Sequence, residues 1–83
     1  MRVIVEVMPK EGILDPQGKA VMQALHQLGY DEVNGVRVGK RIVLDVNETD
    51  AATAIKRAEE MADTLLANEN VEGFKVHVAE EIA

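Results

Sequence analysis

The stretch that decides the fold runs from Glu32 to Glu48 and reads EVNGVRVGKRIVLDVNE. It holds two runs rich in β-branched residues, Glu32–Val38 and Arg41–Glu48, separated by Gly39-Lys40. Two such runs joined by two residues predict a β-hairpin, and glycine at the first central position suits a type II′ turn. The second run also alternates, which places one apolar set on one face: Ile42, Leu44 and Val46.

A helix is expected immediately before this hairpin. Asp15-Pro16 predicts its start, because Asp caps free backbone N–H groups and Pro loses no hydrogen bond at the first helical position. Gly29 is typical of a helix end. The helix carries an apolar stripe at the spacing i, i+3, i+4, i+7, which consists of Val21, Ala24, Leu25 and Leu28.

A second helix is expected after the hairpin. It begins at Asp50 or Thr49 and runs to about Ala67, with Asn68 as a left-handed C-cap. Its buried stripe consists of Ile55, Ala58, Ala62 and Leu65, with Met61 and Leu66 at the margins.

The two ends of the chain are predicted to be strands. Arg2–Met8 alternates and ends at Pro9, whereas Val71–Ala79 alternates through Phe74, Val76 and Val78. Lys10–Leu14 is a loop, and the tail Glu80–Ala83 is expected to fray. The order β-α-β-β-α-β predicts one α+β domain over residues 1–83, with a ferredoxin-like fold: a four-stranded antiparallel sheet and two helices on one face.

The other face of this sheet is expected to be partly apolar. A turn at Gly39-Lys40 sets Val36 opposite Val43, and cross-strand partners share a face. If Val3, Val5 and Val7 face the helices, the far side carries Ile4, Met8, Val36, Val38 and Val43. This pattern predicts self-association; the alternative is a β-bulge that turns Val36 and Val38 inward.

Composition excludes several classes of function. The chain has 83 residues, a formal net charge of −6, 2% aromatic residues and no cysteine. Acidity argues against binding to nucleic acid or anionic membranes, and the lack of aromatics argues against base stacking. Disulfides and thiolate sites are excluded. No apolar run has the length of a membrane span or resembles a signal peptide, so a soluble cytoplasmic protein is expected.

No catalytic, cofactor-binding or metal-binding constellation is predicted. His26 and His77 belong to no metal-ligand pattern, and the carboxylates are interpreted as solvated surface. Among ferredoxin-like proteins, an RNA-recognition domain needs aromatics on its sheet, and an acylphosphatase-type enzyme needs an anion loop with an arginine. The loop Pro9–Leu14 offers only Lys10 and Gly12, so the sequence does not predict an anion loop of that kind.

Three connections have a more specific sequence than their structure demands: Leu14–Lys19, Val38–Lys40 and Leu65–Asn68. Gly18 is unusual there, because glycine in a first helical turn costs about 1 kcal/mol relative to alanine. It is either tolerated or allows another backbone to approach closely.

At these residues the chain resembles the PurS subunit of phosphoribosylformylglycinamidine (FGAM) synthase. The resemblance covers nearly the whole chain, and Glu69 is a departure where the family often has Pro. The runs that carry it are Leu14-Asp15-Pro16-Gln17-Gly18-Lys19, Leu28-Gly29-Tyr30-Asp31, Val36-Arg37-Val38-Gly39-Lys40, Leu65-Leu66-Ala67-Asn68 and Val71-Glu72.

The resemblance implies a non-catalytic role in purine biosynthesis. The complex converts formylglycinamide ribonucleotide, glutamine and ATP to the amidine, with ammonia released by a PurQ glutaminase and used by a PurL synthetase. The small subunit is implied to form a dimer or tetramer, to bridge PurL and PurQ and to assist ammonia transfer. ATP and Mg are expected to serve the whole complex, with no cofactor on this chain.

Five residues are partner-interface candidates: Asp15, Gly18, Lys19, Gly39 and Lys40. Asp15 can instead be a plain helix cap and Gly39 a plain turn residue. The lysines are the stronger candidates, because no local structural rule demands them.

Two other classes of function stay open. An ACT-like regulatory module has the same order of elements and binds an amino acid at a dimer interface, which Gly12 and Gly18 would permit. A stand-alone enzyme is the third reading. Binding of an amino acid by the isolated chain would favour the module, and turnover of an acyl phosphate or amide would favour the enzyme.

Overall fold

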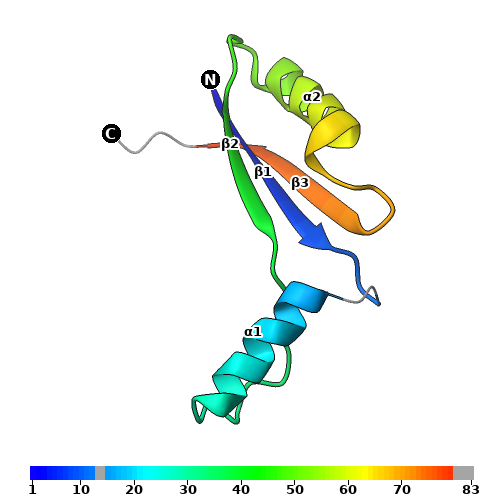
Figure 1. Cartoon of the computed structure of the whole chain (residues 1–83). Helices are drawn as coiled ribbons and strands as arrows, with labels where there is room; N and C mark the ends of the chain where they lie inside the picture. The colour runs from blue at the N-terminus through cyan, green and yellow to red at the C-terminus, as the bar shows by residue number, and fades with distance from the viewer. Residues whose placement is uncertain (13–14, 80–83) are drawn as a thin grey trace.

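The computed structural model describes residues 1–12 and 15–79. In this part of the chain the fold is α+β, with a three-stranded antiparallel sheet in the order β2-β1-β3 (Figure 1). The elements in chain order are β1 (Arg2–Pro9), α1 (Pro16–Gln27), β2 (Lys40–Asp45), α2 (Ala51–Met61), the π-helical turn η1 (Ala62–Leu66) and β3 (Glu72–Val78).

The central strand β1 provides the core. Val3, Val5 and Val7 are fully buried on one face of the sheet, as their alternation predicts. Val5 pairs with Ile42 of β2 and with Val76 of β3. A strand with partners on both sides satisfies its backbone hydrogen bonds, which explains why the most β-branched run of the chain lies in the middle.

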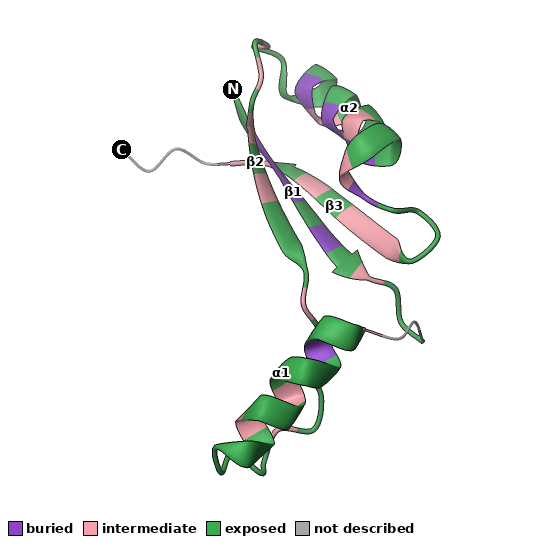
Figure 2. Ribbon diagram, viewed as in Figure 1, coloured by how far each residue is buried: buried purple, intermediate pink, exposed green. Residues whose placement is uncertain are grey.

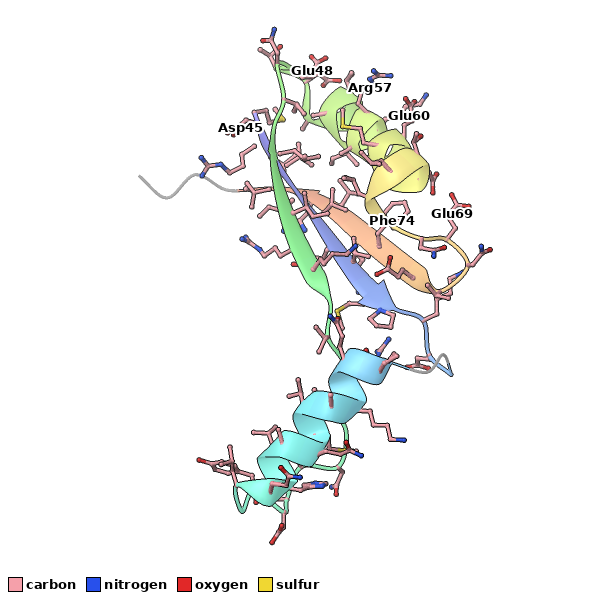
Figure 3. All side chains as sticks on the ribbon, viewed as in Figure 1. Asp45, Glu48, Arg57, Glu60, Glu69 and Phe74 are labelled. Carbon is pink, nitrogen blue, oxygen red and sulfur yellow. The ribbon has the colours of Figure 1, made fainter. Side chains whose placement is uncertain are left out.

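Helix α2 covers this face over β1 and β3. Its N-cap is Asp50, whose carboxylate accepts a hydrogen bond from the backbone N–H of Thr53 at 3.1 Å, as predicted. Ala54, Ala58 and Ala62 are fully buried, and their small size lets the helix lie close to the valines. Figure 3 shows Phe74 of β3 on the side of the sheet that faces this helix.

The end of this second helix differs from the prediction. The helical turns end at Leu66, and Ala67 leaves in an extended conformation with φ −124°. The left-handed C-cap predicted at Asn68 is wrong, because no described residue other than glycine has a positive φ. Instead, the backbone N–H of Asn68 donates to the Glu72 carboxylate at 2.9 Å.

The predicted hairpin and fourth strand are wrong for the single chain. Lys40 is the first residue of β2, and the segment 33–39 runs on as an unpaired extension of that strand (Figure 1). Gly39 does not reverse the chain; it lies against β1, and a Cβ there would be 2.4 Å from the carbonyl oxygen of Val7. Because the chain continues instead of turning, the pairing expected between Val36 and Val43 does not form.

Helix α1 begins where the sequence predicts but does not lie on the sheet. It projects beyond the end of β1, whereas α2 alone covers the sheet (Figures 1 and 2). The predicted apolar stripe is largely uncovered: Val21 is 42% exposed and Leu28 74% exposed. The arrangement of two helices on one face of four strands is therefore not formed by one chain.

The overall dimensions express the same opening. The radius of gyration is 16.0 Å, with extents of 48 × 34 × 14 Å. A compact domain of this length would have a radius of gyration of about 12 Å. The single chain thus consists of a packed part, β1–β3 with α2, and a projecting part, residues 16–39, which we call the arm.

Candidate functional site

Asp15, which directly precedes the arm, connects the two ends of the arm at its base. One carboxylate oxygen accepts from the backbone N–H of Gly18 at 3.0 Å, and the other accepts from that of Val38 at 2.8 Å. These two hydrogen bonds, that of Val38 foremost, hold the pKa of the Asp15 carboxyl below its ordinary value. The predicted helix cap is confirmed, and the same side chain also fixes the segment that enters β2.

The arm has two limbs, helix α1 and the segment 33–39, and they contact each other at Gly18. It is the only buried residue of α1, and a Cβ there would be 2.1 Å from the carbonyl oxygen of Val36 and 2.7 Å from the Asp15 carboxylate. The close approach of another backbone, one of the two readings of this glycine, is therefore made within the chain. At the far end of α1, His26 Nε2 lies 2.7 Å from the carbonyl oxygen of Val33.

Gly39 and Lys40 lie where the arm meets the sheet. Gly39 has the Met8 sulfur as well as the Val7 carbonyl beside it. Lys40 reaches across the helix-covered face of the sheet: its Nζ donates to the carbonyl oxygen of Leu66 at 3.4 Å and lies 3.9 Å from the Glu72 carboxylate. A cation at the end of the helical turns complements their dipole.

Lys19 lies apart from Lys40, at an open cleft of about 370 Å³ beside the base of the arm. The cleft also contains Lys10 and Arg37, which the sequence did not single out as interface residues. In the sequence, only their basic side chains could have indicated this role, because Lys10, Lys19 and Arg37 lie on three separate segments that the fold brings together. The cleft thus collects Asp15, Gly18 and Lys19 of the interface candidates, and it does not include Gly39 or Lys40.

The walls of this cleft are tied to the sheet. The Lys10 backbone N–H donates to the carbonyl oxygen of Val71 at 2.8 Å, and Lys10 Nζ donates to that of Glu69 at 2.5 Å. The Arg37 guanidinium donates to the carbonyl oxygen of Pro9. In the same loop, the pKa of Glu69 is raised, chiefly by its hydrogen bond to the Asp63 carboxyl and by the charge of that group.

A second open surface lies beside α2 over the uncovered strand β2. It is an apolar groove of about 500 Å³, and we call it the α2 groove. Leu65 on its wall is 82% exposed, and Arg57 and Glu60, 2.8 Å apart, lie at its edge on α2 (Figure 3). The sequence prediction placed Leu65 in the core and missed this groove. The lining residues are Leu44, Arg57, Glu60, Met61, Thr64, Leu65 and Leu66.

The far face of the sheet carries three of the five self-association candidates. Ile4 pairs with Val43, and Met8 has the same orientation on β1. Met8 is 40% and Val43 47% exposed, whereas Ile4 is buried. Val36 and Val38 lie in the arm instead, because the hairpin does not form. Charged residues share this face, including Arg2 and Asp45 at 3.5 Å.

Within residues 1–12 and 15–79, no group of three or more His, Cys, Asp or Glu residues is placed to hold a metal ion. His26 contacts a carbonyl in the arm, and His77 pairs with Ile4 in the sheet, so the two histidines belong to different parts of the molecule. In the same ranges, no helix is long and apolar enough to cross a membrane.

Comparisons with known proteins agree on one family. The family model PurS, phosphoribosylformylglycinamidine (FGAM) synthase, matches residues 2–80. The PurS subunit of Bacillus subtilis is 42% identical over 82 residues, 99% of this chain and 96% of that protein. Its solved structure superposes with a TM-score of 0.84, covering 95% of this chain and 98% of the other.

The same fold occurs in a structure of PurLQS from Thermotoga maritima. The matching chain gives a TM-score of 0.83 at 24% identity, covering 94% of this chain and 95% of the other. At that level of identity the likeness concerns the fold. The superposition includes the projecting part, since nearly all of the chain is covered.

Proposed function

Since this chain belongs to the PurS family of FGAM synthase subunits in purine biosynthesis, we propose that it is the non-catalytic subunit that bridges a PurQ glutaminase and a PurL synthetase and assists ammonia transfer between them. The observation that carries this proposal is the arm, which exposes an apolar helix that the chain does not itself cover. The occurrence of this fold in a PurLQS structure supports the choice of partners.

The physical benefit of such a bridge is effective concentration. Holding a glutaminase beside a synthetase converts the transfer of ammonia between two proteins into a step within one complex. A closed route also limits loss of ammonia to solvent and its protonation. A subunit that does this needs surfaces for its partners, and the arm and the α2 groove are two such surfaces.

The arm is proposed to bind a second copy of the chain. In each copy α1 exposes Val21 and Leu28, with Leu25 half-buried between them, while the α2 groove lies over β2. Placing α1 of one copy in the groove of the other would put two helices on one face of each sheet. The helix layer of the ferredoxin-like sandwich expected from the sequence would thus be completed by two chains instead of one.

Burial energies favour this exchange. Each large apolar side chain removed from water contributes about 1.5–3 kcal/mol, and in a two-fold symmetric dimer every contact occurs twice. Leu28 and Leu65, at 74% and 82% exposure, have the most surface to bury. The gain has to exceed the entropy lost on association, estimated at about 4–15 kcal/mol. The far face, with Met8 and Val43, is a second surface by which two such dimers would form a tetramer.

The chemistry is proposed to take place on the partners. ATP and Mg would serve the synthetase, glutamine the glutaminase, and this chain would hold no cofactor. The complex is proposed to act in the cytoplasm. In this role a substitution on the present chain changes assembly and coupling, and it leaves the intrinsic chemistry of PurL and PurQ unchanged.

Co-elution tests the bridge. Purified PurL and PurQ are run together on a sizing column with and without this chain, in the presence of glutamine and nucleotide. We expect a single complex containing all three proteins only when the chain is present. A PurL–PurQ complex of the same yield without the chain, or failure of the chain to join either partner, would contradict the proposal.

The cleft at the base of the arm favours one alternative function, an ACT-like module that binds an amino acid. Gly12 and Gly18, the two glycines that would permit such a site, both line it. Calorimetry of the isolated chain with a panel of amino acids distinguishes the two functions. Binding with a micromolar Kd supports the module, and heats no larger than dilution support the bridge.

A further inference from the structure

The cleft at the base of the arm combines a basic rim with an apolar floor. Lys10, Lys19 and Arg37 project at its edge and are exposed, whereas Met22 and Val36 are half-buried at its base. Gly35 lies beside them, and a Cβ added there would have no heavy atom within 4 Å. The glycine therefore leaves open space in the cleft, unlike Gly18, which is needed for backbone packing.

The basic rim is unusual in a chain of net charge −6. Ion pairs described in residues 1–12 and 15–79 involve Arg2, Lys40 and Arg57, and none involves the three cations of the cleft. The donors of Lys10 and Arg37 are directed at neutral carbonyl oxygens. Of the two carboxylates at the cleft, Asp15 accepts from two backbone N–H groups and also interacts with the charge of Arg37, and Glu11 is exposed.

Lys19 stays accessible when the apolar stripe of α1 is buried. Lys19 and Leu28 are nine residues apart, which is roughly two and a half helical turns, so they lie on opposite sides of the helix. Binding of a second copy through the stripe therefore leaves the cleft free for a different partner.

We propose that this cleft binds an acidic segment of the PurL synthetase subunit. A carboxylate of that segment lies between Lys19 and Arg37, and a neighbouring apolar side chain packs on Met22 and Val36. The cleft is open and its basic side chains come from three segments of the chain, which fits a protruding protein loop better than an enclosed small molecule. Opposite charges at such a rim accelerate encounter and select the partner. This inference rests on the proposed bridging function.

The test measures the Kd for PurL of the full chain in its native oligomeric state, by calorimetry at low salt. Lys19→Glu reverses a rim charge, and Lys56→Glu makes the same change on the exposed side of α2. Gly35→Asp places an anion in the cleft, and Gly35→Asn places a neutral side chain of the same size at the same position, where a Cβ meets open space. We expect Lys19→Glu and Gly35→Asp to raise the Kd about tenfold or more, and each control less than about twofold.

Salt dependence is measured on the unmodified chain, so it needs no variant to fold. The Kd should rise steeply between about 0.05 and 0.5 M salt, because screening weakens contacts between exposed charges. Wild-type affinity in both cleft variants, equal losses in cleft variants and controls, or a Kd independent of salt would each overturn the inference. In all those cases the unmodified chain still binds PurL, whereas failure of the unmodified chain to bind would count against the bridging function itself.

Discussion

At the scale of single residues, Asp15 connects the start of α1 with the segment that enters β2. Both of its carboxylate oxygens accept backbone N–H groups, from Gly18 and Val38, and these bonds lower the pKa of the group. A carboxyl whose pKa is lowered by folding stabilises the folded state fully at pH values above the pKa that it has in the unfolded chain. The contribution disappears as the pH falls through the folded value.

Acidification is therefore expected to loosen the base of the arm. As the pH falls from 6 to below the ordinary Asp range of about 3.9, amide exchange at Val38 and Gly18 should accelerate at matched intrinsic rates. In Asp15→Asn, which keeps only one acceptor oxygen, Val38 should exchange faster at every pH. Asp50→Asn is the control, since it makes the same change at the N-cap of α2 and should leave the exchange of Val38 unchanged. Unchanged protection of Val38 in Asp15→Asn would contradict this role.

Replacing two glycines of the arm by alanine is expected to affect stability to different extents. Gly18→Ala forces the Cβ against the Val36 carbonyl, so the free energy of unfolding should fall by about 1–3 kcal/mol. Gly35→Ala meets open space and should change it by less than about 0.5 kcal/mol. Urea unfolding of both variants gives the comparison. Equal stability of the two would show that the close approach at Gly18 does not constrain the arm.

Residues with a local role could be predicted, and those with a role across segments could not. The Asp15 cap and the end of α1 at Gly29 follow from neighbouring residues, and Gly29 has the positive φ, 98°, that favours glycine. The second hydrogen bond of Asp15, to Val38, joins positions 23 residues apart. Lys10 and Arg37 lie 27 positions apart in the sequence, and only the fold brings them to one cleft.

At the scale of elements, the arm is the part that distinguishes this chain from a closed sandwich. The alternation of β1 and the caps of both helices predicted the elements themselves. The predicted hairpin is wrong because Gly39-Lys40 is compatible with a turn and also with an extended path beside β1, where Gly39 lies close to the Val7 carbonyl. Without that turn, α1 has no place on its own sheet and exposes its stripe.

Exchange of α1 between two copies predicts the effect of Leu65→Glu. Leu65 is 82% exposed in the single chain, so a charge there should leave the monomer folded. In the α2 groove its charge would be buried against the apolar stripe of α1 from the other copy, so dimerisation should weaken by about tenfold or more. Sedimentation equilibrium gives the mass. A dimer of wild-type stability would show that α1 does not occupy this groove.

The far face is tested in the same way by Val43→Glu. Val43 lies on the opposite side of the sheet from α2 and is 47% exposed. If wild type is a tetramer that uses this face, Val43→Glu should yield a dimer. Leu65→Glu should instead weaken the dimer itself, because it disrupts the exchange of α1. If wild type is a dimer, Val43→Glu should leave its mass unchanged. A monomer in Val43→Glu would assign the primary contact to the far face instead.

At the scale of the whole molecule, the single chain is open rather than compact. A radius of gyration of 16.0 Å, against about 12 Å for a compact chain of this length, leaves large surfaces for other chains to cover. The sequence indicated the family, but it could not show this opening. Patterns within one chain report which side chains are apolar, and they do not report which chain covers them.

Coupling of the two active sites is the most direct test of this account. The synthetase is assayed for FGAM formation with glutamine plus the glutaminase, and separately with excess ammonium, each with and without this chain. The account predicts that the glutamine-dependent rate falls at least about tenfold without the chain, while the ammonium-dependent rate changes much less. Equal losses of both rates, or full glutamine-dependent activity without the chain, would contradict it.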